Sequence, residues 1–120
     1  MNIGERGRSG EDRVASFLRK NGWCLVKRNY QCRFGEIDII AENSEYIIFV
    51  EVKTRNESPL VSPAQSVDIK KQRRIMMTAA DFLIKYDSSL QPRFDVAEVT
   101  VRTREDGSLR FSLNYIENAF

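Results

Sequence analysis

The sequence has 120 residues, which is enough for one hydrophobic core but not for two, so we expect a single domain over residues 1–120. Its 42% hydrophobic and 30% charged residues are ordinary for a globular protein, and a net charge of +2 does not by itself indicate a partner. The sequence contains no histidine, which excludes His-based triads, His-ligated zinc and a His general base. Any hydrolytic chemistry must therefore use carboxylates, lysine and metal.

The apolar runs and the cysteines of the sequence indicate the cellular compartment of the protein. No apolar run approaches the roughly 18 residues of a membrane span, and the N-terminal segment has no apolar region typical of a signal peptide. Cys24 and Cys32 are too few and too widely spaced for a zinc motif, so we interpret both as structural thiols. We therefore expect a cytoplasmic protein that binds no membrane.

The first predicted element is a helix from about Gly10 to Asn21. Ser9 is its expected N-cap, Asp12 completes a capping box, and Gly22 is expected to end the helix. Glu11 lies at the edge of the apolar stripe. It is either a first-turn acid that interacts favourably with the helix dipole or part of an acidic cleft.

Residues 23–28 predict a strand that residues 30–34 continue or turn into a hairpin over residues 35–55. The hairpin sequence GEIDIIAENSEYIIFVEVKTR has two runs rich in Ile, Val and Phe around a polar turn, with Asn43 and Ser44 expected at the tip. Because side chains alternate between the faces of a strand, one face should form a core wall. Its members are Ile37, Ile39, Ala41, Tyr46, Ile48, Val50 and Val52.

The opposite face of this hairpin gathers charges at its open end. In the expected register Asp38 faces Phe49 and Glu36 faces Glu51, and like charges that face each other across a ladder destabilise it. A bound cation would remove that conflict. Asp38 and Glu51 would be diagonal neighbours about 7 to 8 Å apart, and their carboxylates suit magnesium or manganese. The alternative is a solvated face of an edge hairpin, against which the apolar side chains of the same face argue.

These residues also carry a resemblance. Asp38, twelve further residues and then Glu51-Val52-Lys53 resemble the PD-(D/E)XK signature of restriction-endonuclease-like nucleases, which include archaeal Holliday-junction resolvases. The wording GEIDII followed by FVEVKTR is more closely similar to the YraN-like family of small bacterial proteins in that superfamily. Segments 4–11 and 93–96 resemble the same family. Ile37 replaces the Pro of the signature, which leaves the metal-binding acid intact.

The resemblance implies an α/β fold with a restriction-endonuclease-like core, a mixed β-sheet flanked by helices in the order αβββαββ. It implies a metal-dependent endonuclease that hydrolyses phosphodiester bonds, with structured or branched DNA as the expected substrate. Asp38 and Glu51 would hold Mg²⁺ or Mn²⁺ with the backbone carbonyl of Val52, and Lys53 would orient the attacking water and stabilise transition-state charge. The candidates to complete the metal and catalytic set are Glu11 and, more weakly, Glu36.

A second helix is expected to start at Ser62 and Pro63, after a polar loop at residues 56–62, and to run to about Asp87 with a break near Asp68. Cations crowd its N-terminal half, where the helix dipole disfavours them. An anionic partner would relieve this conflict, whereas the alternative is a solvated helix face. The predicted nucleic-acid-binding residues are Lys70, Lys71, Gln72, Arg73, Arg74 and, from the preceding strand, Arg55.

Residues 94–101 and 109–115 predict a last hairpin, closed by residues 105–108. Asp95, on an otherwise apolar strand, is interpreted as a structural salt bridge or as a group that supports the site. Two functions compete with the nuclease: a non-catalytic nucleic-acid-binding or adaptor protein with the same fold, and a protein-binding module. A homodimer is expected by analogy, because symmetric junctions are cut at two points.

Overall fold

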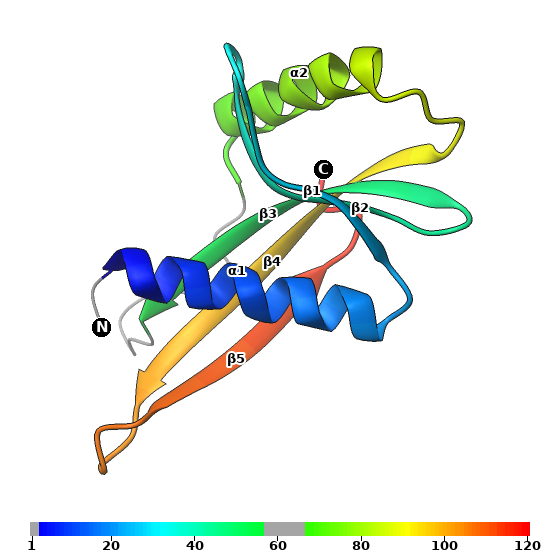
Figure 1. Cartoon of the computed structure of the whole chain (residues 1–120). Helices are drawn as coiled ribbons and strands as arrows, with labels where there is room; N and C mark the ends of the chain where they lie inside the picture. The colour runs from blue at the N-terminus through cyan, green and yellow to red at the C-terminus, as the bar shows by residue number, and fades with distance from the viewer. Residues whose placement is uncertain (1–2, 57–66) are drawn as a thin grey trace.

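The computed structural model describes residues 3–56 and 67–120, in which a five-stranded sheet carries a helix on each face (Figure 1). The elements in chain order are α1 (Ile3–Lys20), β1 (Cys24–Cys32), β2 (Gly35–Glu42), β3 (Tyr46–Asn56), α2 (Ile69–Lys85), β4 (Gln91–Thr103) and β5 (Leu109–Ile116). This is the αβββαββ order and the mixed, helix-flanked sheet expected from the sequence, so the fold class is confirmed. No helix within the described residues is long and apolar enough to cross a membrane.

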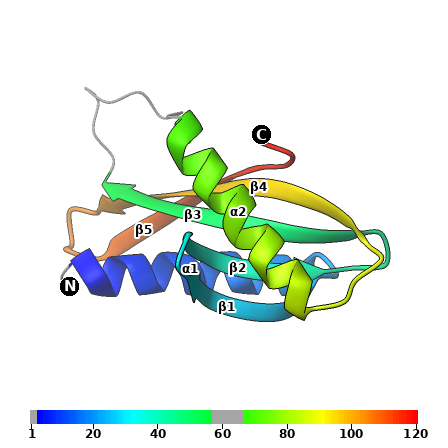
Figure 2. The same ribbon diagram turned by 90° about the horizontal axis from the view of Figure 1, so that it is seen from above.

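The strands lie side by side in chain order, from β1 at one edge to β5 at the other. Only β3 and β4 run parallel to each other, and the other three neighbouring pairs are antiparallel. A parallel pair needs a crossover connection, and α2 lies in it. Seen from above, α2 crosses one face of the sheet while α1 lies against the other (Figure 2).

Each helix packs against one face of the sheet and forms a separate hydrophobic core there. Successive side chains of β3 alternate between these two cores. Ile48 and Val50 lie in the core beneath α1, whereas Ile47 and Phe49 lie in the core beneath α2. All four side chains are almost fully buried. The central strand is therefore covered on both faces in its first half, and in its more polar second half Val52 still packs against the α1 core.

The turn between β2 and β3 lies one residue later than expected. Asn43 Oδ1 accepts hydrogen bonds from the backbone N–H groups of Glu45 and Tyr46 at 2.8 and 2.7 Å. The Asn43 N–H also donates to the Tyr46 carbonyl at 3.0 Å. Asn43 therefore pairs with Tyr46 at the base of the turn, and Ser44 and Glu45 form its tip.

The later turn shifts the register by two residues. Ile40, not Asp38, lies opposite Phe49, so the expected pairing of Glu36 with Glu51 is wrong. Continued by two residues past this pair, the observed register brings Asp38 opposite Glu51. The two residues that we expected to be diagonal neighbours thus meet directly where the ladder ends.

The residues of β2 that precede Ile39 are not paired with β3 and remain paired with β1. This part of β1 and β2 curves toward α2 (Figure 1). Gly35 ends this β1–β2 arm with a φ of 152°, and a Cβ there would lie 3.3 Å from Thr78 Oγ1 of α2. Ile37 consequently belongs to the α2 core, so its expected place beside Ile39 is wrong. The strand turns at Asp38, which interrupts the regular alternation of faces.

Both helices begin where the sequence did not predict. Because α1 begins at Ile3, Ser9 lies inside the helix and is not its N-cap. The helix α2 begins at Ile69, with Asp68 as N-cap accepting from the Lys71 N–H at 2.8 Å. The expected break near Asp68 is thus the observed helix start, and the expected start at residues 62–63 lies outside the described residues.

Candidate active site

The first carboxylate of the candidate site is that of Asp38, at the point where β2 leaves β3. Its Oδ2 accepts a hydrogen bond of 2.8 Å from the Val52 N–H. The side chain therefore replaces a backbone partner at the end of the ladder and is fixed against β3. Glu51 precedes Val52 and is only 8% exposed. Both carboxylates belong to the junction of the two strands.

Lys71 joins this pair from the first turn of α2. Its Nζ lies 2.5 Å from Glu51 Oε1, and the lysine side chain is 47% exposed while that of Glu51 is 9% exposed. The N-cap hydrogen bond of Asp68 fixes the backbone of Lys71. Lys71 is one of the residues predicted to bind phosphate, and in the structure it is also the counter-ion of a predicted metal ligand.

Glu11 reaches the site from α1, which approaches β3 closely at Gly10. A Cβ on Gly10 would lie 2.3 Å from Thr54 Oγ1, so glycine is what allows the helix to lie this close. Arg28 Nη2 lies 3.8 Å from Glu11 Oε1. The Asn29 amide nitrogen, in its hydrogen-bonding orientation, donates to Glu11 Oε1 at 3.1 Å.

Asn29 also links Glu11 to Glu36. In the same orientation its amide nitrogen lies 3.3 Å from Glu36 Oε1. Asn29 has a φ of 53°, in the left-handed region that asparagine tolerates. Glu36 itself is exposed, so it lies at the rim of the acidic group. Asn29 was not among the predicted site residues, although an asparagine between two predicted strand segments is a detectable signal in the sequence.

The four acids act on one another electrostatically. Burial raises the pKa of the Asp38 carboxyl to about 7, the negative charge of Glu51 adds to this rise, and those of Glu11 and Glu36 add less. The Val52 hydrogen bond opposes the rise. Burial likewise raises the pKa of Glu11, and Arg28 partly offsets it. A carboxyl held in this way is costly to ionise unless a cation comes close.

The donor set fits a magnesium-type ion with water ligands. Among residues 3–56 and 67–120, no three Asp, Glu or Cys side chains form a group arranged to hold a metal. Asp38 and Glu51 nevertheless supply two carboxylates, and Mg²⁺ commonly takes one or two carboxylates from a protein and keeps several waters. Glu11 and Glu36 lie near this pair and act on Asp38 through their negative charges.

Lys53 follows on β3, two residues beyond Glu51 and hence on the same face of the sheet. It is half-buried and lies opposite Glu98 of β4. Glu98 is only 4% exposed, and its Oε1 lies 3.9 Å from Arg55 Nη2. Sequence analysis missed Glu98. The signal was a carboxylate between the apolar residues 97 and 99.

Asp95, by contrast, lies apart from this group. It is fully buried and accepts from Arg93 Nε at 2.9 Å and Nη2 at 2.8 Å, from Tyr115 Oη at 2.6 Å and from the Asn118 N–H at 2.9 Å. Arg93 stacks over the ring of Tyr46 at 4.9 Å from its centroid. Of the two interpretations of Asp95, the structural salt bridge is therefore the one observed.

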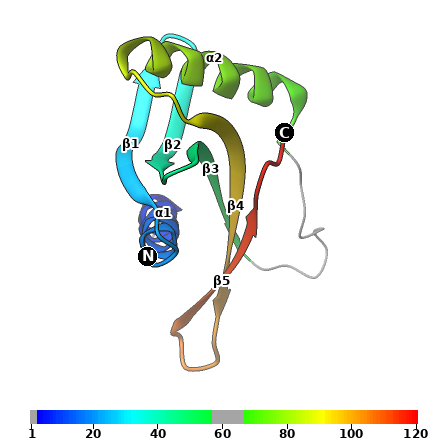
Figure 3. The same cartoon turned by 90° about the vertical axis from the view of Figure 1, so that its right-hand side faces the viewer.

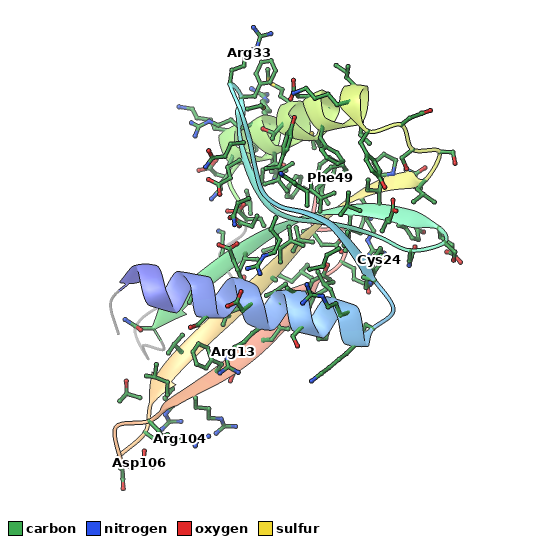
Figure 4. The ribbon with its side chains drawn as sticks, viewed as in Figure 1. Arg13, Cys24, Arg33, Phe49, Arg104 and Asp106 are labelled. Atoms are coloured by element: carbon green, nitrogen blue, oxygen red, sulfur yellow. The ribbon has the colours of Figure 1, made fainter. Side chains whose placement is uncertain are left out.

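The remaining cations of α2 form a basic surface beside the acids. Lys70, Arg73 and Arg74 are exposed, whereas Gln72 Nε2 donates to the Val67 carbonyl at 2.8 Å. Arg33 lies at the tip of the β1–β2 arm (Figure 4), and Gly35 of the same tip lies against Arg74 and Thr78 in the middle of α2. The structure thus places an arginine from the arm beside the predicted basic helix, and Gln72 serves the helix start.

The comparisons with known proteins agree on the family. Residues 10–99 match the family model described as "Uncharacterised protein family UPF0102". A UPF0102 protein of Caldicellulosiruptor saccharolyticus is 37% identical over 121 residues, covering 100% of both chains. One from Caldicellulosiruptor bescii is 39% identical over 123 residues, also covering both completely, and one from Persephonella marina is 37% identical over 116 residues, covering 96% of this chain and 92% of the relative.

Among solved structures, the chain is similar to SfsA of Pyrococcus furiosus in complex with Ca²⁺. The sequence identity is 15% and the TM-score 0.46, with 97% of this chain and 64% of that chain covered. From the family match and the full-length relatives, this chain belongs to the UPF0102 family, the YraN family that its sequence motifs indicated.

Proposed function

We propose that this protein is a metal-dependent endonuclease that hydrolyses phosphodiester bonds in structured or branched DNA. The observation that carries the proposal is the meeting of Asp38 and Glu51 where β2 leaves β3, with the pKa of Asp38 raised to about 7. A protein that needs no cation gains nothing from burying an acid beside other acids, because the arrangement destabilises the fold. A site that binds a divalent cation needs this arrangement.

Asp38, Glu51 and the backbone carbonyl of Val52 would hold Mg²⁺ or Mn²⁺. Such an ion polarises a scissile phosphate and lowers the pKa of a water molecule. Glu11 and Glu36, bridged by Asn29, add negative potential that favours a divalent cation over a monovalent one. The Val52 N–H keeps Asp38 directed toward β3, so that the carboxylate needs little reorganisation when the cation arrives.

Lys53 would act on the phosphate. It shares a strand face with Glu51, so its ammonium group can donate to a non-bridging oxygen on which charge grows as the bond breaks. It would also orient the attacking water. Glu98, opposite Lys53 on β4, places a buried carboxylate on the strand beside the lysine.

The basic surface of α2 would bind the DNA backbone. Lys71 neutralises Glu51 in the absence of a metal, and it becomes available to a phosphate once a divalent cation takes its place. Lys70, Arg73 and Arg74 continue this surface, and Arg33 extends it along the β1–β2 arm. Two active sites in a homodimer would suit a symmetric junction.

The test is cleavage of duplex, flap, single-stranded and four-way-junction DNA with Mg²⁺ or Mn²⁺, using the wild type, Asp38→Asn and Asp87→Asn. Asp87 is an exposed acid that follows α2, so its replacement controls for the loss of one negative charge. We expect metal-dependent cleavage by the wild type and by Asp87→Asn only. Wild type without cleavage of any substrate, or cleavage that survives in Asp38→Asn, would contradict the proposal.

One observation favours the second candidate, a non-catalytic nucleic-acid adaptor. The ammonium group of Lys71 already neutralises Glu51 within the chain, as a protein without a metal would require. If the protein is an adaptor, it should bind DNA equally well with Mg²⁺ and with a chelator. If it is a nuclease, it should lose cleavage when the metal is removed.

A further inference from the structure

The outer side of α2 carries exposed apolar side chains. Five large apolar residues are exposed in the described part of the chain, and four of them lie on this helix: Ile69, Met76, Met77 and Ile84. Their exposed fractions run from 42% for Met76 to 84% for Ile84. Contiguous apolar patches are uncommon on the surface of monomeric proteins, and where they occur they mark interaction sites.

These side chains form one continuous surface. Successive residues of a helix are rotated by about 100°, so the four residues and the exposed Ala80 fall within an arc of about 100°. The buried residues of α2 lie on the opposite side of the helix and are Ile75, Thr78, Ala79 and Phe82. Figure 3 shows α2 along the top of the molecule, with the sheet and α1 below it. The helix therefore has a second apolar face, which we call the outer stripe, directed away from the sheet.

The outer stripe is symmetric about its centre. Ile69 precedes Met76 by seven residues, and Ile84 follows Met77 by seven. When two copies of α2 pack antiparallel with a two-fold axis between Met76 and Met77, Ile69 of each copy therefore faces Ile84 of the other. The same axis places Arg73 opposite Ala80, whose small side chain leaves room for the apolar stem of the arginine. A second copy of the helix thus matches the stripe along its whole length.

The charges of α2 favour the same antiparallel arrangement. Its N-terminal half carries four cations, Lys70, Lys71, Arg73 and Arg74. In a parallel pair these two basic halves would lie side by side and repel each other. In an antiparallel pair each basic half lies beside the C-terminal half of the other copy, in which Asp81 and Lys85 form an ion pair. The repulsion between the two basic halves is thereby avoided.

We infer that the outer stripe binds a second copy of this chain, which gives a two-fold symmetric dimer held by an antiparallel pair of α2 helices. Lys71, paired with Glu51, lies outside the stripe, so each copy keeps its own candidate site. The inference goes beyond the proposed function, because this pairing requires neither a metal nor DNA.

The size of the stripe sets the expected affinity. From Ile69 to Ile84 it is about 23 Å long, at 1.5 Å per residue, and about 10 Å wide. A standard interface buries about 800 Å² of each partner. Because the stripe is smaller than this, we expect a dimer that dissociates in the micromolar range.

The experiment measures the dissociation constant by sedimentation velocity from about 1 to 500 µM, without DNA or metal, for the wild type, Ile69→Glu and Ile84→Lys. Both substitutions suit the isolated helix, because an acid in its first turn and a base in its last turn interact favourably with the helix dipole. Each variant dimer loses two apolar contacts of about tenfold each, so its dissociation constant should rise about 100-fold.

A mixture of the two variants tests the register. The mixed dimer keeps one contact of Ile69 with Ile84 and pairs the introduced carboxylate with the introduced ammonium group, so it should bind within about tenfold of the wild type. A mixture of Ile69→Glu with Met77→Lys is the matched control, because these two positions do not face each other. Two contacts are still lost in that mixture, and it should stay about 100-fold weaker than the wild type.

Leu113→Glu controls for the general effect of a charge on an exposed apolar residue. Leu113 is 36% exposed and lies on β5, and its replacement should leave the dissociation constant unchanged. Three results would overturn the inference and leave the proposed function intact. They are a wild type that stays monomeric up to about 500 µM, a dimer that Leu113→Glu dissociates and the α2 variants do not, and an Ile69→Glu and Ile84→Lys mixture that recovers no affinity. A dimer without DNA cleavage would instead overturn the proposed function alone.

Discussion

Asp38 and Asp95 are both acids on strands of one sheet, and they are treated in opposite ways. Asp95 is fully buried and has four hydrogen bonds, two of them from Arg93, so its charge is neutralised within the fold. Asp38 has one backbone donor, and burial, together with the charges of three nearby acids, raises its pKa to about 7. A buried charge that serves the fold brings its own partner. A half-buried acid among other acids, such as Asp38, would instead be stabilised by a cation from outside.

The largest effect that separates the two acids is on stability. Asp95→Asn leaves the guanidinium group of Arg93 without its counter-charge, which should lower the free energy of unfolding by about 3–5 kcal/mol. The same substitution at Asp38 keeps an oxygen for the Val52 N–H and removes a charge that repels its neighbours. We expect Asp38→Asn to be at least as stable as the wild type in urea unfolding without metal. Equal destabilisation of the two variants would show that Asp38, like Asp95, is compensated within the fold.

Lys53→Ala should act on the rate of cleavage, whereas Asp95→Asn should act on the stability of the fold. An interaction made only in the transition state changes the rate and not the ground-state affinity. Lys53→Ala should lose about two to three orders of magnitude in single-turnover cleavage, as for one preorganised donor, and keep its fold and its DNA affinity. Parallel losses of affinity and rate would make Lys53 a phosphate anchor instead.

The pH dependence of stability tests the raised pKa of Asp38. An acid whose pKa is higher in the folded than in the unfolded state stabilises the fold while it is protonated. This contribution is complete below pH 4 and is lost as the pH rises through about 7. Between pH 5 and 8 the metal-free wild type should lose stability, on the order of a few kcal/mol, relative to Asp38→Asn. Melting curves across this range decide it, and added Mg²⁺ should remove most of the difference.

The smallest expected effect concerns Lys71. Its ammonium group competes with a divalent cation for Glu51, and an ion pair with one exposed partner is worth about 1 kcal/mol. Lys71→Ala should therefore bind Mg²⁺ about fivefold more tightly in calorimetric titration. Lys70→Ala removes a neighbouring exposed lysine and serves as the control for general charge effects. If both variants change equally, Lys71 has no special role at the acid pair.

The sequence predicted the helices and strands better than it predicted the pairing register between the strands. Composition and alternation were enough for the central hairpin and for the fold class, because burial imposes those patterns. The register depended on Asn43, whose side chain captures two backbone N–H groups and moves the turn by one residue. A shift of this kind leaves the apolar pattern intact, so periodicity does not reveal it.

Contacts between distant elements were the part that the sequence could not supply. The ion pair of Lys71 with Glu51 and the bridge of Asn29 between two acids join residues from different elements. The burial of Glu98 depends on which other parts of the chain pack over β4, and the local sequence does not show this. The grouping of the acids was predicted from the alternation of faces in the hairpin, and the resemblance to a nuclease signature supported it.

The parallel pairing of β3 with β4 has a consequence for how the protein folds. Tyr46 lies opposite Gln91, so this pairing closes a long loop through α2, whereas the three antiparallel pairs join neighbours in the chain. Contacts between distant residues form slowly, and we expect the hairpins to assemble first. Until β4 docks, the apolar edge of β3 at residues 47–50 is open to pairing with another chain. A newly synthesised chain is therefore most prone to aggregate just before β4 pairs with β3. The same step brings α2 and its cations over the acids.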